Sequence, residues 1–205
     1  MLLANLKNKF IELLFNSCIK DIADIKENYS QESFIAYCIY CEGGFDCFGS
    51  GGCTKKWLNE HVQELKQYHK NDNETLLYIE TFADEWDYFG AAKYENFRDI
   101  NELVDNIFKA YYDDEIEDLN TTPEGLDSDG LDRFFQDGVT TVINQLKASK
   151  CFDSMPFEND LLLGLQFSDP SKGAMSLTVE ISEQVNSPQW HKKILESYIP
   201  IISRV

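Results

Sequence analysis

The stretch SFIAYCIYC, residues 33–41, constrains the fold more than any other part of this sequence. If these residues form a β-strand, successive side chains point to opposite faces of a sheet, and both faces are apolar. A strand of this kind needs other parts of the chain to cover it on both sides. We therefore predict that residues 33–41 form a central strand of a sheet, with helices packed against it.

The glycines after this strand predict a hairpin and then a loop. Residues 42–44, Glu-Gly-Gly, have turn chemistry, and residues 45–49, Phe-Asp-Cys-Phe-Gly, can pair back on the strand. The run Gly-Ser-Gly-Gly at 49–52 predicts a loose loop, which ends where Thr54 can cap a helix. A Walker-type Lys-Ser/Thr does not follow this run, so we do not predict phosphate binding.

Apolar periodicity assigns the rest of the chain to helices and short strands. Spacings of i, i+3 and i+4 predict helices at residues 2–28, 54–69, 97–111, 129–149 and 190–198. Apolar runs predict strands at 75–82 and 160–168, and alternation predicts one at 175–181, where a helix remains an alternative. Helices and strands do not alternate regularly, which is typical of the α+β class. We expect residues 1–205 to form a single α+β domain with a mainly antiparallel sheet and helices packed against it.

The chain is strongly acidic, which argues against several classes of partner. It contains 36 Asp and Glu residues against 18 Lys and Arg, a formal net charge of -18. A surface of this charge repels nucleic acids and anionic membrane surfaces. No apolar stretch approaches the ~18 residues needed to cross a bilayer, and the N-terminal sequence lacks the basic segment of a signal peptide. We expect a cytoplasmic protein that binds neither nucleic acid nor membrane.

The acidic residues are concentrated in one third of the chain. Between Asn71 and Thr140 there are 20 acidic residues and four basic ones. The run DDEIED at residues 113–118 alone has five carboxylates in six positions. It follows the C-terminus of a predicted helix, where the helix dipole makes each negative charge unfavourable by about 0.3–1 kcal/mol. Stability therefore does not explain this run.

Two interpretations of these acids remain open. The first is a solvated loop that keeps the protein soluble. The second is a surface that docks on a basic protein, because aromatic residues lie among the acids, and strong interfaces combine aromatic anchors with complementary charge. On the second interpretation, the partner-binding residues are Asp84, Glu85, Trp86, Asp87, Tyr88, Tyr111, Tyr112, Asp113, Asp114, Glu115, Glu117 and Asp118.

Four of the six cysteines have a spacing that invites a metal-site interpretation. Cys38, Cys41, Cys47 and Cys53 spell C-x2-C-x5-C-x5-C. A zinc site needs the first pair on a tight turn, whereas Cys38 and Cys41 lie at odd separation in a predicted strand and point to opposite faces. Buried free thiols are the favoured interpretation, and a metal-binding domain on these cysteines is one alternative.

The remaining candidates for chemistry are weak. The three histidines are scattered and belong to no catalytic motif. Asp127, Asp129 and Asp132 resemble part of a calcium loop, but Gly and Glu are missing at the positions that an EF-hand requires. A helix cap is favoured there, and weak calcium binding stays open. We expect no catalytic residues, no metal and no cofactor. The second alternative is an enzyme or small-ligand binder with a pocket near Trp86.

Five stretches, spread over most of the chain, carry a resemblance to a known family. They are SFIAYCIYCEGGFDCFG, LLYIETFADEWDYFG with its Trp-x-Tyr, FRDINELVDNIF, Phe-Ser-Asp at 167–169 and Val-Asn-Ser-Pro at 185–188. Together they resemble a bacterial family catalogued as domain of unknown function 4303. Its members have no established enzymatic activity and look like immunity proteins of polymorphic-toxin systems, judged by the genes beside them.

The resemblance implies an immunity protein, and the acidic charge agrees with it because many such toxins are basic nucleases. Our leading hypothesis is a non-enzymatic binding protein that neutralises a basic, nuclease-like toxin domain by occlusion. The acids would steer the encounter, and desolvated aromatic side chains would hold the complex.

Overall fold

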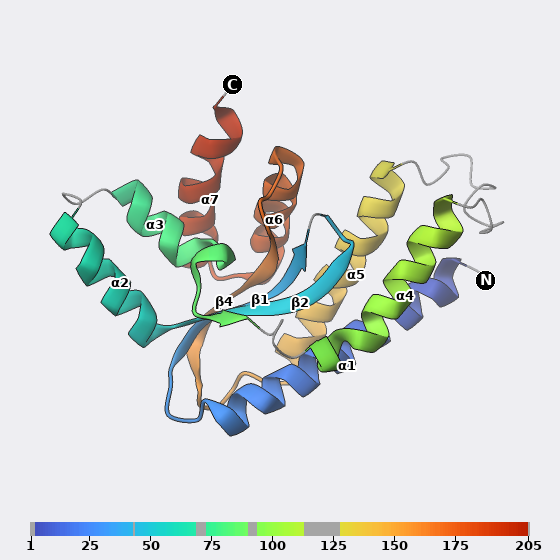
Figure 1. Cartoon of the computed structure of the whole chain (residues 1–205), viewed down its shortest axis with the longest axis horizontal. Helices are drawn as coiled ribbons and strands as arrows, with labels where there is room; N and C mark the ends of the chain where they lie inside the picture. Colours follow the sequence, from blue (N-terminus) through green and yellow to red (C-terminus); the bar gives the residue numbers. More distant parts are fainter. Residues whose placement is uncertain (1–2, 43, 69–72, 90–93, 113–127, 205) are drawn as a thin grey trace.

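The computed structural model describes residues 3–42, 44–68, 73–89, 94–112 and 128–204. Its helices are α1 (Leu3–Asn28), α2 (Lys55–Tyr68), α3 (Asn73–Thr81), α4 (Tyr94–Tyr112), α5 (Ser128–Ala148), α6 (Lys172–Val185) and α7 (Pro188–Ser203), with a short 3-10 helix, η1 (Ala83–Glu85). Its strands are β1 (Phe34–Glu42), β2 (Cys47–Thr54), β3 (Tyr88–Phe89) and β4 (Phe157–Phe167). The chain is therefore an α+β protein, as predicted (Figure 1).

β1 is the central strand that the sequence predicted. The strand order is β3-β2-β1-β4; β1 is antiparallel to β2 and parallel to β4, and β2 is antiparallel to β3. Both faces of β1 are covered, because Ile39 is 1% exposed on one face and Cys38 is 2% exposed on the other. The sheet is mainly antiparallel, with one parallel pair that the sequence did not reveal.

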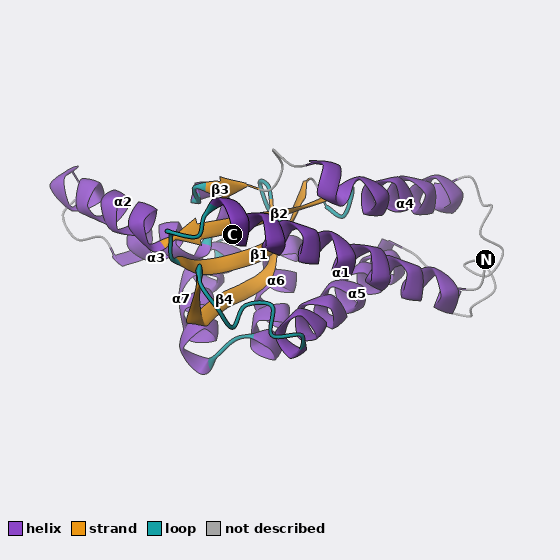
Figure 2. Ribbon diagram, turned by 90° about the horizontal axis from the view of Figure 1, so that it is seen from below, coloured by secondary structure: helices purple, strands orange, loops and turns teal. Residues whose placement is uncertain are grey.

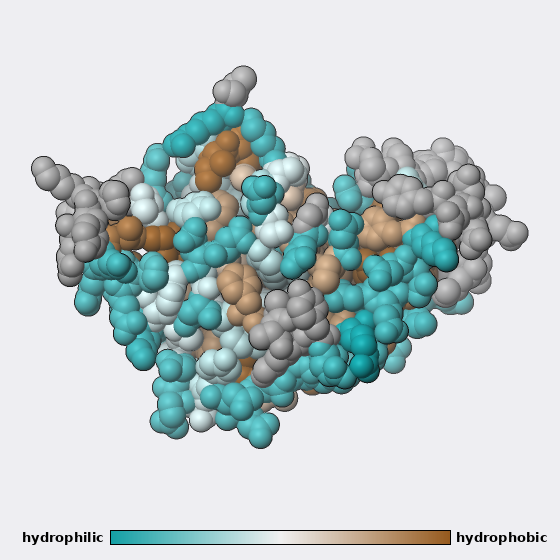
Figure 3. All heavy atoms as spheres, in the orientation of Figure 1, coloured by the Kyte–Doolittle hydropathy of each residue, from teal (hydrophilic) through white to brown (hydrophobic). Residues whose placement is uncertain are grey.

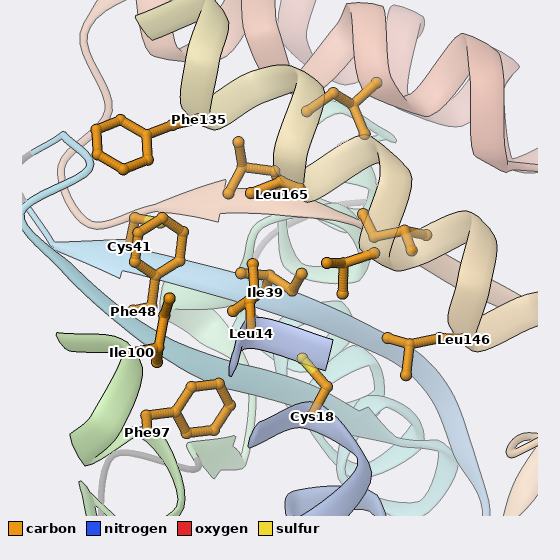
Figure 4. Close-up of a cluster of buried hydrophobic side chains, with 14 of the residues drawn as sticks. Leu14, Cys18, Ile39, Cys41, Phe48, Phe97, Ile100, Phe135, Leu146 and Leu165 are labelled. Carbon is orange, nitrogen blue, oxygen red and sulfur yellow. The ribbon is translucent and has the colours of Figure 1, made fainter. Parts of the chain in front are cut away.

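Two hydrophobic clusters lie on opposite faces of the sheet. The larger cluster joins α1, α4 and α5 to the sheet, and Figure 4 shows side chains from these helices converging with side chains from β1, β2 and β4. The smaller cluster joins η1 and α7 to the other face. Figure 2 shows α1, α4 and α5 extending side by side toward one end of the molecule, while α2 lies at the other end.

One predicted strand, at 75–82, is mostly the helix α3. The buried residues of α3 are Ile79 and Thr81, and Phe82, which directly follows the helix, is buried too. An apolar run of this length fits both periodicities, so the sequence pattern alone cannot separate them.

The predicted strand at 175–181 is also wrong, because these residues belong to α6. Ser171 caps this helix, and its side-chain oxygen accepts a hydrogen bond from Ala174 N at 3.2 Å. The most buried positions include Thr178, Ile181 and Val185, which follow helical spacing. The helix that remained an alternative at this position is the observed element.

The glycine run at 49–52 belongs to β2 and is not a loop. Gly52 pairs with Tyr37 of β1. A Cβ atom on Gly52 would lie 3.0 Å from the ring of Phe34, closer than carbon atoms pack. Glycine therefore lets the Phe34 ring approach the β2 backbone, and the prediction of a loop was wrong because this glycine serves close packing.

Candidate functional site

The exposed side of α4 carries a row of acidic residues. They are spaced three or four positions apart, so that they share one side of the helix: Glu95, Asp99, Glu102 and Asp105. The opposite side of α4 packs into the larger cluster. Two basic residues lie on this helix, and one of them, Arg98, is 2.9 Å from Glu95. In Figure 3 the side chains over α4 are mostly hydrophilic.

Asn101 fixes this helix to the sheet. Its side-chain oxygen accepts a hydrogen bond from Phe48 N at 2.7 Å, and its side-chain nitrogen donates one to Phe48 O at 2.9 Å. The amide group thus takes the place that a neighbouring strand would take beside β2. The acidic row is therefore held in a defined position along this edge of the sheet.

The acidic row continues onto the β1–β2 hairpin. Burial raises the pKa of the Cys47 thiol, and the negative charges of Glu42, Asp105 and Asp46 raise it further. Asn101 of α4 bonds to Phe48, the residue after Cys47, so this helix lies beside the hairpin that carries Glu42 and Asp46. We call the exposed carboxylates of this region the α4 acidic surface: Glu42, Asp46, Glu95, Asp99, Glu102 and Asp105.

The predicted acids at 84–87 lie elsewhere, around η1. Asp84 is exposed and accepts a hydrogen bond from the Tyr40 hydroxyl, and Glu85 is partly exposed. The carboxylate of Asp87 accepts hydrogen bonds from Thr54 N at 2.9 Å and from Thr54 Oγ1 at 2.6 Å. Since Thr54 directly precedes α2, these hydrogen bonds from Thr54 to Asp87 stabilise the N-terminus of that helix, so Asp87 has a structural role.

Trp86 and Tyr88 are buried, which corrects the prediction that they are surface anchors. Trp86 is 4% exposed, and its indole nitrogen donates to Ile79 O at 3.2 Å. Tyr88 is 5% exposed, and its hydroxyl donates to Asp21 Oδ1 at 2.8 Å. Trp86 packs in the smaller cluster and Tyr88 in the larger one. The predicted aromatic residues are therefore not gathered on one exposed surface.

The last predicted residues lie at and beyond the end of α4. Tyr111 is partly buried and packs against the larger cluster. Tyr112 is the last residue of α4, and its side chain is outside the described part of the chain. The acids Asp113, Asp114, Glu115, Glu117 and Asp118 also lie outside the described residues. In the sequence they continue directly from the helix that carries the α4 acidic surface.

The structure also contains a buried polar cluster that the sequence did not reveal. The carboxylate of Asp21 is fully buried and accepts hydrogen bonds from three hydroxyls: Ser50 at 2.7 Å, Tyr88 at 2.8 Å and Tyr37 at 3.1 Å. Burial raises the pKa of the Tyr37 hydroxyl well above its usual range, and Cys18 and Asp21 add to this. One signal was present in the sequence, because Asp21 interrupts the inward apolar stripe of the first helix between Cys18 and Ile22.

The cysteines are six free thiols, and most are buried. Cys38 lies in the smaller cluster and Cys41 in the larger one, which confirms that they point to opposite faces of the sheet. Burial raises the pKa of both thiols. In the described ranges no three His, Cys, Asp or Glu side chains come together as metal ligands.

The predicted calcium segment is described only in part. Asp127 lies outside the described residues, while Asp129 belongs to the first turn of α5 and Asp132 is exposed on that helix. The side chain of Asp129 is outside the described part, so the predicted helix cap remains a prediction.

The hollows that described residues line include the following three. One of about 360 Å³ lies between α3 and α7 and is lined by Tyr78, Pro200 and Ile201. Another, of about 610 Å³, lies beside Phe45 and Phe167. The third, of about 590 Å³, lies beside the first half of β4. Trp86 lines none of these three, because its ring is part of the core.

Comparisons with known proteins identify a family but no characterised relative. Within the described residues, each helix is too short or too polar to cross a membrane. No curated protein and no solved structure matches the chain. A family model described as Domain of unknown function (DUF4303) matches residues 14–187, which is most of the sequence. The match includes β1, the sheet partners of β1 and the α4 acidic surface, and the chain therefore belongs to the DUF4303 family.

Proposed function

We propose that this protein is a non-enzymatic binding protein that docks on a basic protein through the α4 acidic surface. The observation that carries the proposal is the row of four exposed carboxylates on α4, which Glu42 and Asp46 extend. Charges of one sign on one surface attract an oppositely charged protein over a distance and raise the association rate. The acidic run at 113–118, which follows α4 in the sequence, would enlarge this surface.

The partner that fits this surface is a basic, nuclease-like toxin domain, for which this chain would be the cytoplasmic immunity protein. The resemblance of the family to polymorphic-toxin immunity proteins favours this partner class over other basic proteins. An immunity protein that blocks its toxin by occlusion needs a surface of complementary shape and charge, but it does not need to catalyse a reaction. The raised pKa values of Cys38 and Cys41 are consistent with this, because a protonated, buried thiol is a poor nucleophile.

This proposal revises which aromatic residues we expect at the interface. Trp86 and Tyr88 stabilise the fold, so they would not contact a partner that binds the folded protein. Tyr111, which is only partly buried near the end of α4, remains a candidate anchor.

The test measures association with a basic toxin domain, which the proposal expects to be encoded by a gene beside that of this protein. Four neutral substitutions on α4 (Glu95→Gln, Asp99→Asn, Glu102→Gln and Asp105→Asn) should slow association at low salt by about tenfold or more, within the range of electrostatic steering. Dissociation should change little. The difference should shrink at high salt, because the Debye length falls to about 3 Å at 1 M. Stopped-flow mixing gives both rate constants.

A control variant removes the same charge from other parts of the surface. The substitutions Glu60→Gln, Glu64→Gln, Glu183→Gln and Glu196→Gln change exposed residues of α2, α6 and α7. We expect this control to associate almost as fast as the unmodified protein. Equal slowing in both variants would show that only net charge matters and would refute a specific surface. The absence of any complex with the neighbouring toxin would refute the immunity function.

A further inference from the structure

β4 leaves the sheet for a short distance near its start. Phe157 pairs with Phe34, and the next pair is Leu162 with Ala36. Four residues of β4, 158–161, therefore stand opposite a single residue of β1, Ile35. The extra residues form a bulge, a feature that ends regular pairing and reorients a strand edge. The bulge is fastened from one side, because Trp190 Nε1 donates to Asp160 O at 2.9 Å.

The outer edge of β4 is covered beyond the bulge by α6 and the residue after it. Asn186 accepts a hydrogen bond from Leu163 N at 2.8 Å and donates one to Leu163 O at 2.7 Å. Thr178 Oγ1 donates to Leu165 O at 3.0 Å. Both contacts satisfy backbone groups that point away from β1, as another strand would.

The open hollow of about 590 Å³ continues this line toward the start of β4. Its lining includes Lys147, Phe152, Asp153, Asn159, Leu161 and Asn186. Leu162 is the first residue that pairs with β1 after the bulge, and alternate strand residues direct their backbone groups to the same side, so we infer an outward position for Leu161, next to the outward Leu163. At Leu163 the amide of Asn186 occupies the place of a neighbouring strand. At Leu161 the hollow occupies that place.

The charges around the hollow are predominantly negative. Asp153, Glu158 and Asp160 line it together with one lysine, Lys147. The ammonium group of Lys147 donates to Val185 O but keeps its positive charge, and Lys55 forms an ion pair with Glu158 at 3.1 Å, so the net negative charge of the lining comes from Asp153 and Asp160. Hydrogen bonds from Ser33 and Lys55 lower the pKa of Glu158, which keeps this carboxylate ionised.

We propose that this hollow is a docking site for an extended, Lys- or Arg-bearing segment of a partner protein, which adds to β4 as a further strand. The backbone of the segment pairs with the outward groups near Leu161, which is the β-strand addition mode of peptide recognition. Its basic side chains face Asp153 and Asp160. A second copy of this chain fits the site less well, since its net charge of -18 would meet a negative lining.

The hollow and the α4 acidic surface lie on opposite sides of β1, since β4 is one edge strand and α4 contacts β2 at Phe48, a position that β3 does not pair with. The two proposals are therefore independent. Variants of α4 do not change the lining of the hollow, and a failure of the α4 test leaves the present proposal standing.

The test uses the peptide acetyl-Lys-Val-Lys-Val-Lys-amide and the full chain labelled with nitrogen-15. A matched peptide carries N-methyl groups on alternate backbone nitrogens, which keeps the charges and removes the donors that a strand ladder requires. We expect the first peptide to shift the amide signals of residues 159–163 and 185–187 with a Kd of about 1 mM or tighter. The methylated peptide should bind at least about tenfold more weakly, because it forms no ladder.

Two protein variants complete the test. Asp153→Asn should weaken binding of the first peptide several-fold, while Glu183→Gln, which removes the same charge from an exposed position of α6, should not. Equal binding of the two peptides would show charge attraction alone and would overturn the proposal. The absence of saturable shifts at residues 159–163 would overturn it too. A dimer in solution that covers Leu161 would assign the hollow to a second copy and would also overturn it.

Discussion

At the scale of single residues, the carboxylate of Asp21 connects one helix to three strands. It lies on α1, and its hydrogen-bond donors are Tyr37 on β1, Ser50 on β2 and Tyr88 on β3. A buried carboxylate is tolerated when hydrogen bonds replace its water. The three hydroxyls therefore set both the position of α1 and the pairing of the short strand β3. Tyr88 was predicted as a surface residue, yet its partner lies 67 positions away in the sequence.

Removing one of these hydrogen-bond donors measures how much its bond to Asp21 contributes to the free energy of unfolding. We expect Tyr88→Phe to lower the free energy of unfolding by about 1.5–3 kcal/mol, the range for a hydrogen bond to a charged group. The ring contacts with Tyr29 and Phe34 should persist, because the ring itself is kept. Tyr29→Phe is the control, since Tyr29 is 37% exposed. Urea unfolding measures both variants, and equal stability of Tyr88→Phe and the unmodified protein would contradict this role.

A close contact between two helices gives a second prediction at this scale. A Cβ atom on Gly138 of α5 would lie 2.6 Å from the ring of Phe10 on α1. Alanine favours a helix over glycine by about 1 kcal/mol, but overpacking a core costs about 1–3 kcal/mol. We expect Gly138→Ala to be destabilising overall, as thermal unfolding would show.

The matched control for Gly138→Ala is Gly173→Ala in α6. There a Cβ atom would meet Ser171 Oγ at an ordinary 3.7 Å. This variant should be neutral or slightly stabilising, because the helix gains propensity without a clash. If both variants raised the unfolding temperature, the contact between α1 and α5 would be looser than the structure shows.

At the scale of elements, the sequence predicted those segments whose pattern has one interpretation. β1 was predicted because its apolar run is rich in Ile, Phe and Tyr and ends at a Gly-Gly turn, which together favour a strand that is covered on both sides. α3 was missed because TLLYIETF fits both a strand and a helix when read alone. Trp86 was assigned to the surface because it lies among acids, but contacts with η1, α3 and α7 bury it. Such contacts join distant segments and leave no local pattern.

The edges of the sheet were not predictable either, since asparagine side chains cover them. Asn101 covers β2 at Phe48, and Asn186 covers β4 at Leu163. We expect Asn186→Ala to lower the free energy of unfolding by about 2–4 kcal/mol, because two backbone groups lose their partner. The amide of Leu163 should also exchange its hydrogen faster. Asn106→Ala is the control, because Asn106 is exposed and bonds within its own helix. Similar small effects in both variants would show that water replaces Asn186 without cost.

At the scale of the whole molecule, the fold combines a mainly apolar interior, in which Asp21 is a buried carboxylate, with an acidic exterior. The sheet is covered on both faces, so that three of its four cysteines and several tyrosines lie inside. Most carboxylates of the described residues lie outside, where they make the surface negative. Because buried thiols and phenols must stay protonated in the folded state, this division makes stability depend on pH in the alkaline range.

The direction of this dependence follows from the buried thiols. Burial raises the pKa of Cys18, Cys38 and Cys41 above the values that they have in the unfolded chain. In the unfolded chain a thiol ionises near pH 8.5, whereas the folded state keeps its proton. The contribution of each thiol is fully present below about pH 8.5 and is lost as pH rises, by up to about 1.4 kcal/mol per pH unit. Burial raises the pKa of Cys53 as well, and four such thiols should lower the free energy of unfolding by about 5–6 kcal/mol between about pH 7 and pH 9.5.

Urea unfolding at several pH values in this range is the measurement. Cys18→Ala provides the internal comparison, because it removes one buried thiol and should make the decline shallower by the share of one group. The same substitution also changes the free energy of unfolding at neutral pH, because it alters core packing. That change is independent of the slope with pH. A free energy of unfolding that stays constant up to about pH 9.5 would mean that these thiols ionise as easily in the folded chain as in the unfolded one. The interior would then admit water beside β1, which the close packing of Cys38 and Cys41 on its two faces opposes.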